Sequence, residues 1–239
     1  MLGTKISVVT VVLNAVTNID RCVATVLNQT YGNVEYVVID GGSTDGTLDA
    51  LSRYGHRIDY FVSEPDRGLY HAMNKGYHAA TGDYVYFLNS DDWFCDEAVV
   101  ADVAAAIQRN PMVDLVYGDV LMRSGERGVR KPQVPVLNRE SLCRKGFCHQ
   151  ALFARRALLE RTGGFSEKYR IVADGDWLAR ALAAGATSLH LKRDIAVFSL
   201  DGLSGRCNWR DEKRRSLRGN FSPWERFWWR KLPGILGRR

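Results

Sequence analysis

Two adjacent carboxylates end a short apolar run near the middle of the chain. The run YVYFLNSDDW, residues 84–93, passes from apolar side chains to Asn89, Ser90, Asp91 and Asp92. One or two carboxylates, completed by the phosphates of a substrate, form a common ligand set for Mg²⁺ or Mn²⁺. Two acidic residues that simply end a strand in solvent would give the same pattern, so the pair has to be weighed with its surroundings.

Polar side chains also end two other apolar runs. ISVVTVVLN (6–14) ends in Asn14, and VEYVVID (34–40) ends in Asp40. Both runs are continuous and rich in β-branched residues, as expected of strands buried on both faces of a parallel sheet. In open α/β sheets, ligands bind beyond the carboxyl ends of the strands. We therefore expect Asn14, Asp40 and the segment Asn89–Asp92 to lie at one ligand-binding edge.

The elements that position these residues alternate between strand and helix. Apolar residues spaced i, i+3, i+4, i+7 and i+8 predict an amphipathic helix from Ile19 to Leu27, with Asn18 as its cap. Further strands are expected at 58–64, 83–89, 114–122 and 189–200, helices after the turn 41–47 and at 69–80, 96–109 and 173–186, a strand-to-helix segment at 149–165, and a polar loop at 123–138. The alternation predicts an α/β fold, a Rossmann-like, mostly parallel sheet flanked by helices.

The basic charge of the protein is concentrated at its carboxyl end. The formal net charge of the 239 residues is +6, to which residues 206–239 contribute +8 and residues 1–205 contribute −2. The nearly neutral body argues against general nucleic-acid binding. No linker divides residues 1–205, so we expect one domain there, followed by a basic tail.

Several common kinds of site are missing from the sequence. The five cysteines form no C-x-x-C pair and lack zinc-type spacing, which suggests reduced thiols in a cytosolic setting. The first strand is not followed by G-x-G-x-x-G, and Gly41 and Gly46 precede Thr47-Leu48 where a P-loop needs Lys and Ser or Thr. No apolar run approaches the length of about 18 residues that a membrane-spanning helix requires.

Four segments, in this order, resemble the family-2 glycosyltransferases. They are VIDGGSTDGT, EPDRGLYHAMNKG, ATGDYVYFLNSDD and VADGDWLARAL, and the resemblance covers roughly residues 5–205. It implies a GT-A fold with a nucleotide-sugar-binding half (1–92) and an acceptor half (93–205). It also implies a Leloir enzyme of the hexosyltransferase type that uses a UDP-, GDP- or dTDP-sugar. The block DRGLYHAMNKG is most similar to bacterial enzymes that build exopolysaccharide or lipopolysaccharide repeat units.

On the donor side, the resemblance implies a role for each matching residue. The residues implied to bind the nucleotide are Asn14, Asp40, Asp66, Arg67, Lys75 and Asp91. Asp40 would accept a hydrogen bond from a ring N–H of the base, and Asp91 would contact the ribose. Asp92, together with Asp91, would ligate Mn²⁺ or Mg²⁺, which stabilises the charge on a leaving nucleoside diphosphate. Leu13 stands where many relatives carry an aromatic residue, which leaves the choice of base open.

On the acceptor side, Asp174 would be the general base that takes the proton of the acceptor hydroxyl, with inversion at the anomeric carbon. Ala173 replaces the Glu that usually precedes it. Asp176 would face another side of a regular helix, and either aspartate could instead cap a helix that begins near Trp177. Trp177 could form a stacking floor for a sugar or pack in the core. His149-Gln150 lies where relatives place acceptor-side or pocket residues.

The tail mixes aromatic and basic side chains. Four of the six tryptophans lie in residues 206–239, and PWERFWWRKLPGIL combines Trp, Phe and Leu with Arg and Lys. This mixture is typical of segments that bind a membrane surface. Packing on the body or a second subunit is one alternative, and stacking on nucleic acid, which we do not expect, is another. The resemblance implies a lipid-linked saccharide acceptor, and so a cytoplasmic protein, peripheral on the inner face of the plasma membrane.

Two other functions compete with an active glycosyltransferase. A non-catalytic nucleotide-sugar-binding or scaffold protein of the same fold would bind nucleotide without turnover and would be insensitive to Asp174→Asn. A nucleotidyltransferase would need a glycine-rich loop with Arg or Lys after the first strand, and the segment NAVTNIDR that follows it here has no such loop.

Overall fold

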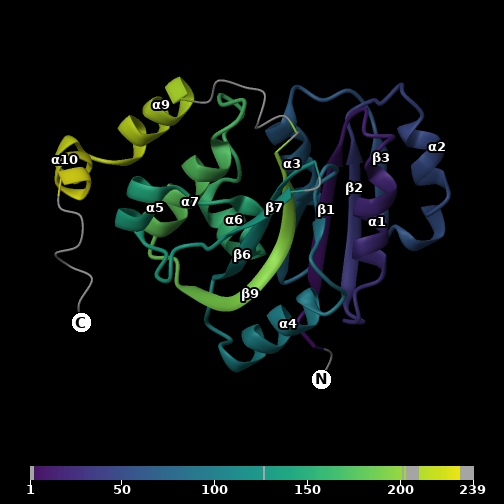
Figure 1. Cartoon of the computed structure of the whole chain (residues 1–239), viewed down its shortest axis with the longest axis horizontal. Helices are drawn as coiled ribbons and strands as arrows, with labels where there is room; N and C mark the ends of the chain where they lie inside the picture. Colours follow the sequence, from purple (N-terminus) through teal and green to yellow (C-terminus); the bar gives the residue numbers. More distant parts are fainter. Residues whose placement is uncertain (1–2, 126, 201, 203–209, 232–239) are drawn as a thin grey trace.

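Strands and helices alternate along the first half of the chain and form one curled sheet with flanking helices (Figure 1). The computed structural model describes residues 3–125, 127–200, 202 and 210–231. The strands are β1 (Ile6–Val12), β2 (Val34–Asp40), β3 (Tyr60–Ser63), β4 (Tyr84–Asn89), β5 (Trp93–Phe94), β6 (Leu115–Ser124), β7 (Arg127–Lys131), β8 (Leu152–Arg155) and β9 (Ser188–Ser199). The helices are α1 (Ile19–Leu27), α2 (Thr47–Ser52), α3 (Leu69–Ala79), α4 (Val99–Arg109), α5 (Arg139–Lys145), α6 (Arg156–Thr162), α7 (Ala173–Ala183), α9 (Arg210–Asn220) and α10 (Pro223–Lys231), with short 3₁₀ turns η1 (Gly55–Arg57) and η2 (His149–Ala151).

The strand order of the sheet is β3-β2-β1-β4-β8-β6-β9-β5, with β7 added beside β6. The strands β3, β2, β1 and β4 run parallel, so their carboxyl ends meet at one edge. Beyond β4 the sheet is mixed, because β8 pairs antiparallel with both β4 and β6. The long strand β9 curves along β6 and ends beside β5, close to the carboxyl end of β4 (Figure 1). This topology brings residues from both halves of the chain to the same edge.

The continuous burial of β1 explains why helices cover both faces of the sheet. All seven residues of β1 are buried. Val9 and Val11 pack in the core that includes Met73 of α3, whereas Ile6 and Val8 pack in the core that contains α1 and α4. A strand with two buried faces needs an uninterrupted apolar sequence, which is the pattern seen in the printed sequence.

The segment 123–138 is the main difference from the predicted elements. It was expected to be a polar loop, but residues 127–131 form β7, and α5 follows at Arg139–Lys145. The sequence RGVRK of β7 has no apolar alternation because the strand pairs only with β6 and lies at an edge of the sheet. Charged edge strands of this kind avoid pairing with other chains, at the cost of a weak sequence signal. Asn18 does precede α1, but its side chain makes no capping hydrogen bond.

The described part of the tail packs on the body of the protein. Leu217 and the adjoining Phe221 are buried in the core that also contains α7. Arg139 Nη2 donates to the carbonyl oxygen of Asn220 at 2.8 Å and to Glu225 Oε1 at 3.0 Å, which ties the junction of α9 and α10 to α5. The described part of the tail therefore packs on the body, which is one of the alternatives to membrane binding given above.

Membrane binding by the tail is not tested by these contacts. On α10, Trp224 is 68% exposed and Phe227 is also exposed. The side chains of Trp209, Trp228 and Trp229, on which that prediction also depends, lie outside the described part of the structure. Within the described ranges, no helix has the length and apolar character needed to cross a membrane.

Candidate active site

A pocket of about 210 Å³ opens at the carboxyl edge of β1 and β4, where the sequence predicts ligand binding. Its polar lining consists of Asp66, Asn89, Ser90, Asp91, Asp92 and Ser199. Its apolar lining includes Val11, Val12, Leu13, Leu69, Ala72 and Phe198. We call this the donor pocket. Residues of β9 contribute to it because that strand ends beside the strand-end aspartates.

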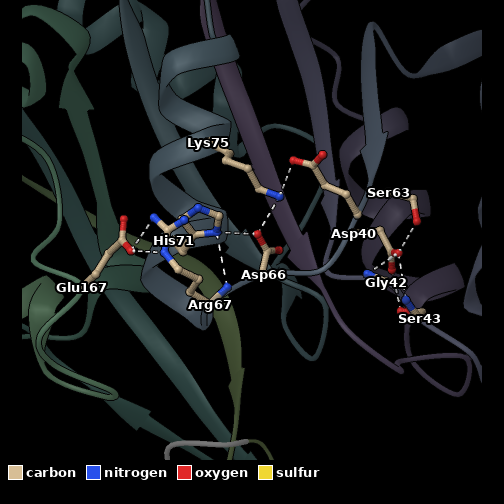
Figure 2. A network of polar contacts seen from close by, with 10 residues as sticks. Asp40, Gly42, Ser43, Ser63, Asp66, Arg67, His71, Lys75 and Glu167 are labelled. Carbon is tan, nitrogen blue, oxygen red and sulfur yellow. Dashed lines mark hydrogen bonds and ion pairs between the residues drawn. The ribbon is translucent and has the colours of Figure 1, made fainter.

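Asp40 is buried at the end of β2 and binds the loop that follows it (Figure 2). Its Oδ2 accepts from the backbone N–H groups of Gly42 and Ser43, each at 2.9 Å, and from Ser63 Oγ at 2.7 Å. The hydroxyl of Ser43 donates to the other carboxylate oxygen. These bonds hold the loop, and Asp40 itself does not line the donor pocket. The adjacent Gly41 does, which leaves room for a ligand at that wall.

Asn14 supports the same loop from the end of β1. Its backbone N–H donates to Ser43 Oγ at 2.8 Å, and its Oδ1 accepts from the backbone N–H of Thr44 at 2.9 Å. The φ angle of Asn14 is 50°, in the left-handed region that Asn tolerates better than most residues. Asn14 and Asp40 were predicted to contact the nucleotide, and the structure places both where they shape the pocket wall.

Asp66 lies between Lys75 and His71 and presents one free oxygen (Figure 2). Its Oδ1 is 2.6 Å from Lys75 Nζ and 2.8 Å from His71 Nδ1. Its Oδ2 is buried and has no hydrogen-bond partner among the described residues, although the side chain lines the donor pocket. A Cβ atom at Gly41 would lie 3.2 Å from this oxygen. Asp66 therefore offers a hydrogen-bond acceptor at the wall opened by Gly41.

Lys75 supports Asp66 and does not itself line the donor pocket. Burial alone would lower the pKa of Lys75, but its ion pairs with Asp66 and Glu64 raise it above the ordinary value. Arg67, also predicted to border the nucleotide, is 72% exposed and makes two hydrogen bonds to Glu167, at 2.9 and 3.1 Å. In this structure Arg67 ties the start of α3 to a distant loop.

Asp92 is the most buried acid of the donor pocket, with 2% of its surface exposed. Its Oδ1 accepts from the backbone N–H of Ser199 at 2.8 Å, and its Oδ2 accepts from Gln150 Nε2. Burial raises the pKa of Asp92 well above its ordinary value, while the bond from Ser199 opposes that shift. A divalent cation beside this carboxyl would favour its charged form. Asp91 is half-buried and lines the same pocket.

The chemistry of these oxygens fits a hard divalent cation. In addition to the two carboxylates, Asn89 Oδ1 and Gln150 Oε1 are buried acceptors without a partner among the described residues. The ranges that the structure describes contain no group of three His, Cys, Asp or Glu side chains arranged to hold a metal. A cation here would have to complete its ligand shell with phosphates or water, as Mg²⁺ and Mn²⁺ commonly do.

Asp174 lies close to Tyr70 and His149. Its Oδ1 is 3.1 Å from Tyr70 Oη, whose single proton is also directed to the carbonyl oxygen of Ile171 at 2.6 Å, and its Oδ2 lies 3.3 Å from His149 Nδ1. The side chain is 21% exposed. Burial would raise the pKa of Asp174, but the hydrogen bonds from His149, Gly175 N–H and Tyr70 lower it below the ordinary value. The result is a carboxylate that is ionised at neutral pH and open to solvent on one side.

His149 connects Asp174 to the donor pocket. One ring nitrogen, Nδ1, faces Asp174, and the other, Nε2, is 3.4 Å from the side-chain amide of Asn89. Asn89 ends β4 and lines the donor pocket. Polar contacts through His149 and Asn89 therefore connect Asp174 with the donor pocket. With Nδ1 protonated, His149 donates to Asp174 and fixes the orientation of the carboxylate.

The remaining acceptor-side residues occupy structural positions. Helix α7 begins at Ala173 with Val172 as its N-cap, so neither aspartate is the cap. Asp176 accepts from Arg180 Nε at 3.2 Å and from Asn220 Nδ2 at 2.8 Å, which links α7 to α9.

Gln150 and Trp177 are also held inside the protein. Gln150 is fully buried against Asp92. Trp177 is buried in the core, where its Nε1 donates to Thr162 Oγ1 at 2.8 Å. These contacts favour the core alternative for Trp177 over a stacking floor for a sugar.

A second cavity, of about 260 Å³, is lined in part by Asp174 and His149. Its apolar lining includes Leu142, Phe147, Ile171, Phe198, Leu217 and Phe221. Its polar lining includes Lys131, His149, Asp174, Lys213 and Ser216. Phe198 lines both this cavity and the donor pocket, so the two spaces are neighbours.

Several residues of the site were not assigned from the sequence. Tyr70 lies in the quoted segment EPDRGLYHAMNKG, but its partner Asp174 is more than 100 residues away. Phe198 and Ser199 end β9, and the rule that ligands bind at strand ends could have identified them had the direction of β9 been known. Gly202, also in the lining, lies so close to Asp91 that a Cβ atom there would come within 2.6 Å of its Oδ2.

Comparisons with known proteins agree with this geometry. The family model described as glycosyl transferase family 2 matches residues 7–163. A PGL/p-HBAD biosynthesis glycosyltransferase of Mycobacterium bovis is 37% identical over 212 residues, which are 87% of this chain and 81% of the relative. An uncharacterised glycosyltransferase of Mycobacterium tuberculosis is 37% identical over 179 residues, covering 74% of this chain and 68% of that protein.

Solved structures show the same fold at low sequence identity. Residues 1–349 of S. aureus TarS in complex with UDP match with a TM-score of 0.73 and 21% identity, over 95% of this chain and 69% of that one. The mannosyltransferase PcManGT from Pyrobaculum calidifontis, in complex with GDP-Man and Mn²⁺, matches with a TM-score of 0.67 and 21% identity, over 91% of this chain and 63% of that one. This chain spans 36% of a longer TarS structure.

The extent of the family match and the identity to the curated relatives decide the classification. The mixed α/β fold, with its curled sheet and flanking helices, is that of the GT-A enzymes. The chain belongs to glycosyl transferase family 2 and is a glycosyltransferase.

Proposed function

We propose that this protein is a metal-dependent, inverting glycosyltransferase that uses a UDP-, GDP- or dTDP-sugar. The nucleoside diphosphate would occupy the donor pocket, with Asp66 facing the nucleoside and Asp91 and Asp92 at the diphosphate. Asn14 and Asp40 would act by shaping the wall, because both hold the loop after β2. The solved neighbours that bind UDP, UDP-GlcNAc or GDP-Man support this class of donor.

The observation that carries the proposal is the link between Asp174 and the donor pocket. An acid-rich pocket lies at the carboxyl ends of the parallel strands, and Asp174, an ionised carboxylate that lines the adjoining cavity, is joined to Asn89 of that pocket through His149. Sugar transfer to an acceptor needs this combination, because the donor diphosphate and the acceptor hydroxyl must meet at one point. A pure binding protein has no use for the oriented carboxylate.

The roles of the residues follow from their chemistry. Asp91 and Asp92 would hold Mn²⁺ or Mg²⁺, which when bound neutralises the charge developing on the leaving diphosphate. Asp174 would accept the proton of the acceptor hydroxyl as that oxygen attacks the anomeric carbon. A single base on the face opposite the leaving group gives inversion. His149 and Tyr70 would keep the carboxylate aligned and ionised before the reaction.

We also propose a lipid-linked saccharide acceptor and a role in cell-surface polysaccharide biosynthesis, with the protein peripheral on the inner face of the plasma membrane. Its support is the exposed Trp224 and Phe227 on α10, together with the basic charge of residues 206–239. Exposed aromatic side chains in a basic segment favour binding to anionic lipid surfaces.

Calorimetric titration with UDP, GDP and dTDP, each with Mn²⁺ and with EDTA, tests the donor site. We expect one nucleotide to bind with Mn²⁺ and to lose at least tenfold in affinity with EDTA, because the two carboxylates would otherwise face the diphosphate unscreened. Asp91→Asn and Asp92→Asn should each cause a comparable loss. Asp211→Asn is the matched control, since Asp211 is exposed on α9 and does not line the donor pocket. Equal binding with Mn²⁺ and EDTA would contradict the metal site.

A further inference from the structure

The second cavity combines apolar walls with groups that can take part in chemistry. Seven of its lining side chains are phenylalanines or branched aliphatic residues, and they come from α5, β9, α9 and the segments after α5, before α7 and after α9. Asp174 and His149 line the same space. A molecule bound here would have its apolar part against these walls while one of its hydroxyl groups could reach Asp174.

A glycine in the first turn of α7 keeps this cavity open. Gly175 lines the cavity, follows Asp174 directly and has no left-handed φ angle. A Cβ atom built on Gly175 would meet no described atom within 4 Å. Glycine inside a helix costs about 1 kcal/mol relative to alanine, so neither the backbone nor the packing of the described residues explains its presence. The free volume above Gly175 is available to a ligand.

The nature of the walls decides which kind of ligand fits. A purely saccharide acceptor would turn hydroxyl groups toward Phe147, Phe221 and Leu217, and buried hydroxyls without partners are costly. An apolar group would instead gain about 25 cal/mol for each Å² of apolar surface removed from water. Lys131, Lys213 and Ser216 also line the cavity and can contact the polar part of a bound molecule. The combination favours an amphipathic acceptor over a free sugar.

We propose that the second cavity binds an apolar aglycone, aromatic or alkyl, of the acceptor, next to the hydroxyl that is deprotonated by Asp174. This inference rests on the proposed glycosyltransferase function and adds the chemical class of the acceptor. It places the aglycone over Gly175 and between Phe147, Phe198 and Phe221. The acceptor thus has a sugar or hydroxyl end at Asp174 and a hydrophobic body inside the cavity.

Binding of simple glycosides to the full chain tests this proposal. The probes are hexyl, phenyl and methyl β-D-glucoside, titrated in a calorimeter with and without the nucleotide and Mn²⁺. We expect the hexyl and phenyl glucosides to bind the wild type at least tenfold more tightly than the methyl glucoside, because only they carry apolar surface into the cavity. Gly175→Leu fills the cavity and should remove that preference. Gly175→Ala, a smaller filling, should reduce it partly.

Gly219→Leu is the matched control. Gly219 is also a helical glycine whose added Cβ would meet nothing within 4 Å among the described residues, but it lies on α9 outside the second cavity. This variant should keep the preference for the apolar glucosides. Thermal unfolding should show that both leucine variants fold, since leucine favours helix over glycine. Nucleotide binding at the donor pocket should be unchanged in both.

Three results would overturn the proposal. The wild type could bind the three glucosides equally or not at all, or Gly175→Leu could keep the preference. Gly175→Leu and Gly175→Ala could both be destabilised while Gly219→Leu is stable, which would mean that a segment of this chain already fills the space. Failure of the donor site would appear separately, as loss of nucleotide binding in the wild type.

Discussion

The donor pocket and the second cavity share the side chain of Phe198 but differ in the charge of their polar groups. Three carboxylates, those of Asp66, Asp91 and Asp92, line the donor pocket beside its apolar side chains. Two lysines and one carboxylate, that of Asp174, line the second cavity beside its phenylalanine and aliphatic side chains. His149 joins Asp174 to Asn89 of the donor pocket. The difference suggests that the donor is held through carboxylates and the acceptor by the aromatic and aliphatic walls around Asp174.

The link that His149 makes between Asp174 and the donor pocket can be removed by mutation. Replacing His149 by Leu removes the group that faces Asp174 Oδ2, so we expect kcat for sugar transfer to fall about 100-fold, the scale of a misaligned general base. His149→Asn should recover part of this loss, because its amide N–H can still donate. The measurement is steady-state transfer kinetics, with kcat and acceptor KM determined separately. Equal damage in both variants, or an effect on KM alone, would rule out an orienting role.

A substitution at Asp66 tests whether the donor pocket binds its ligand independently of the second cavity. Asp66→Asn keeps the size of the side chain but removes the charge that pairs with Lys75 and weakens the acceptor at Oδ2. We expect nucleotide affinity to fall about tenfold, the effect of one hydrogen bond to a charged group. Calorimetry with the nucleotide and Mn²⁺ measures this change. Binding of hexyl glucoside should be unaffected, and a loss there as well would show that the two sites are not separate.

Glu35 lies outside both sites and should affect stability only. Its side chain is 10% exposed and accepts hydrogen bonds from Lys5 Nζ at 2.8 Å and Thr81 N–H at 2.7 Å. Burial would raise the pKa of Glu35, but the bonds from Lys5, Ser7 and Thr81 lower it from 4.5 to about 2. Its stabilising contribution is therefore complete above pH 4.5 and is lost as the pH falls toward 2.

Glu35→Gln should accordingly lower the free energy of unfolding at pH 7 by about 2 kcal/mol. The gap between wild type and variant should narrow as the pH falls from 4.5 toward 2, because in this range the Glu35 carboxyl of the unfolded wild type becomes protonated while that of the native protein stays ionised. Urea unfolding at several pH values measures this gap. A gap that stays constant down to low pH would contradict the pKa assigned to Glu35, and altered nucleotide binding would contradict its purely structural role.

The parts of the fold that could be predicted from the sequence depend on local pattern. The apolar runs of β1, β2 and β4 indicate buried strands, and the spacing from Ile19 to Leu27 indicates α1, because each element must bury its own apolar face. The edge strand β7 and the short helix α5 could not be predicted in this way. Strand β7 is charged and pairs on one side only, so burial leaves no period in its sequence.

The sequence predicted the location of the site better than it predicted the contacts that each side chain makes. The strand ends identify the edge where Asp91 and Asp92 lie, because topology alone brings the ends of parallel strands together. The direction of each side chain depends on partners that are distant in sequence. Arg67 was expected at the nucleotide but pairs with Glu167, 100 residues away. Of the residues that line the second cavity, the sequence pointed only to Asp174 and His149, since apolar residues in cavities and in cores look alike.

The most direct test of the account is the effect of Asp174→Asn on sugar transfer and on nucleotide binding in the same preparations. The assay follows transfer to phenyl and hexyl β-D-glucoside from the sugars of whichever nucleotide binds. We predict that the variant loses at least about 1,000-fold in turnover, within the range of lost general-base catalysis, and keeps its nucleotide affinity within about twofold. Turnover that survives in Asp174→Asn, or a wild type that binds nucleotide but transfers no sugar, would contradict the account.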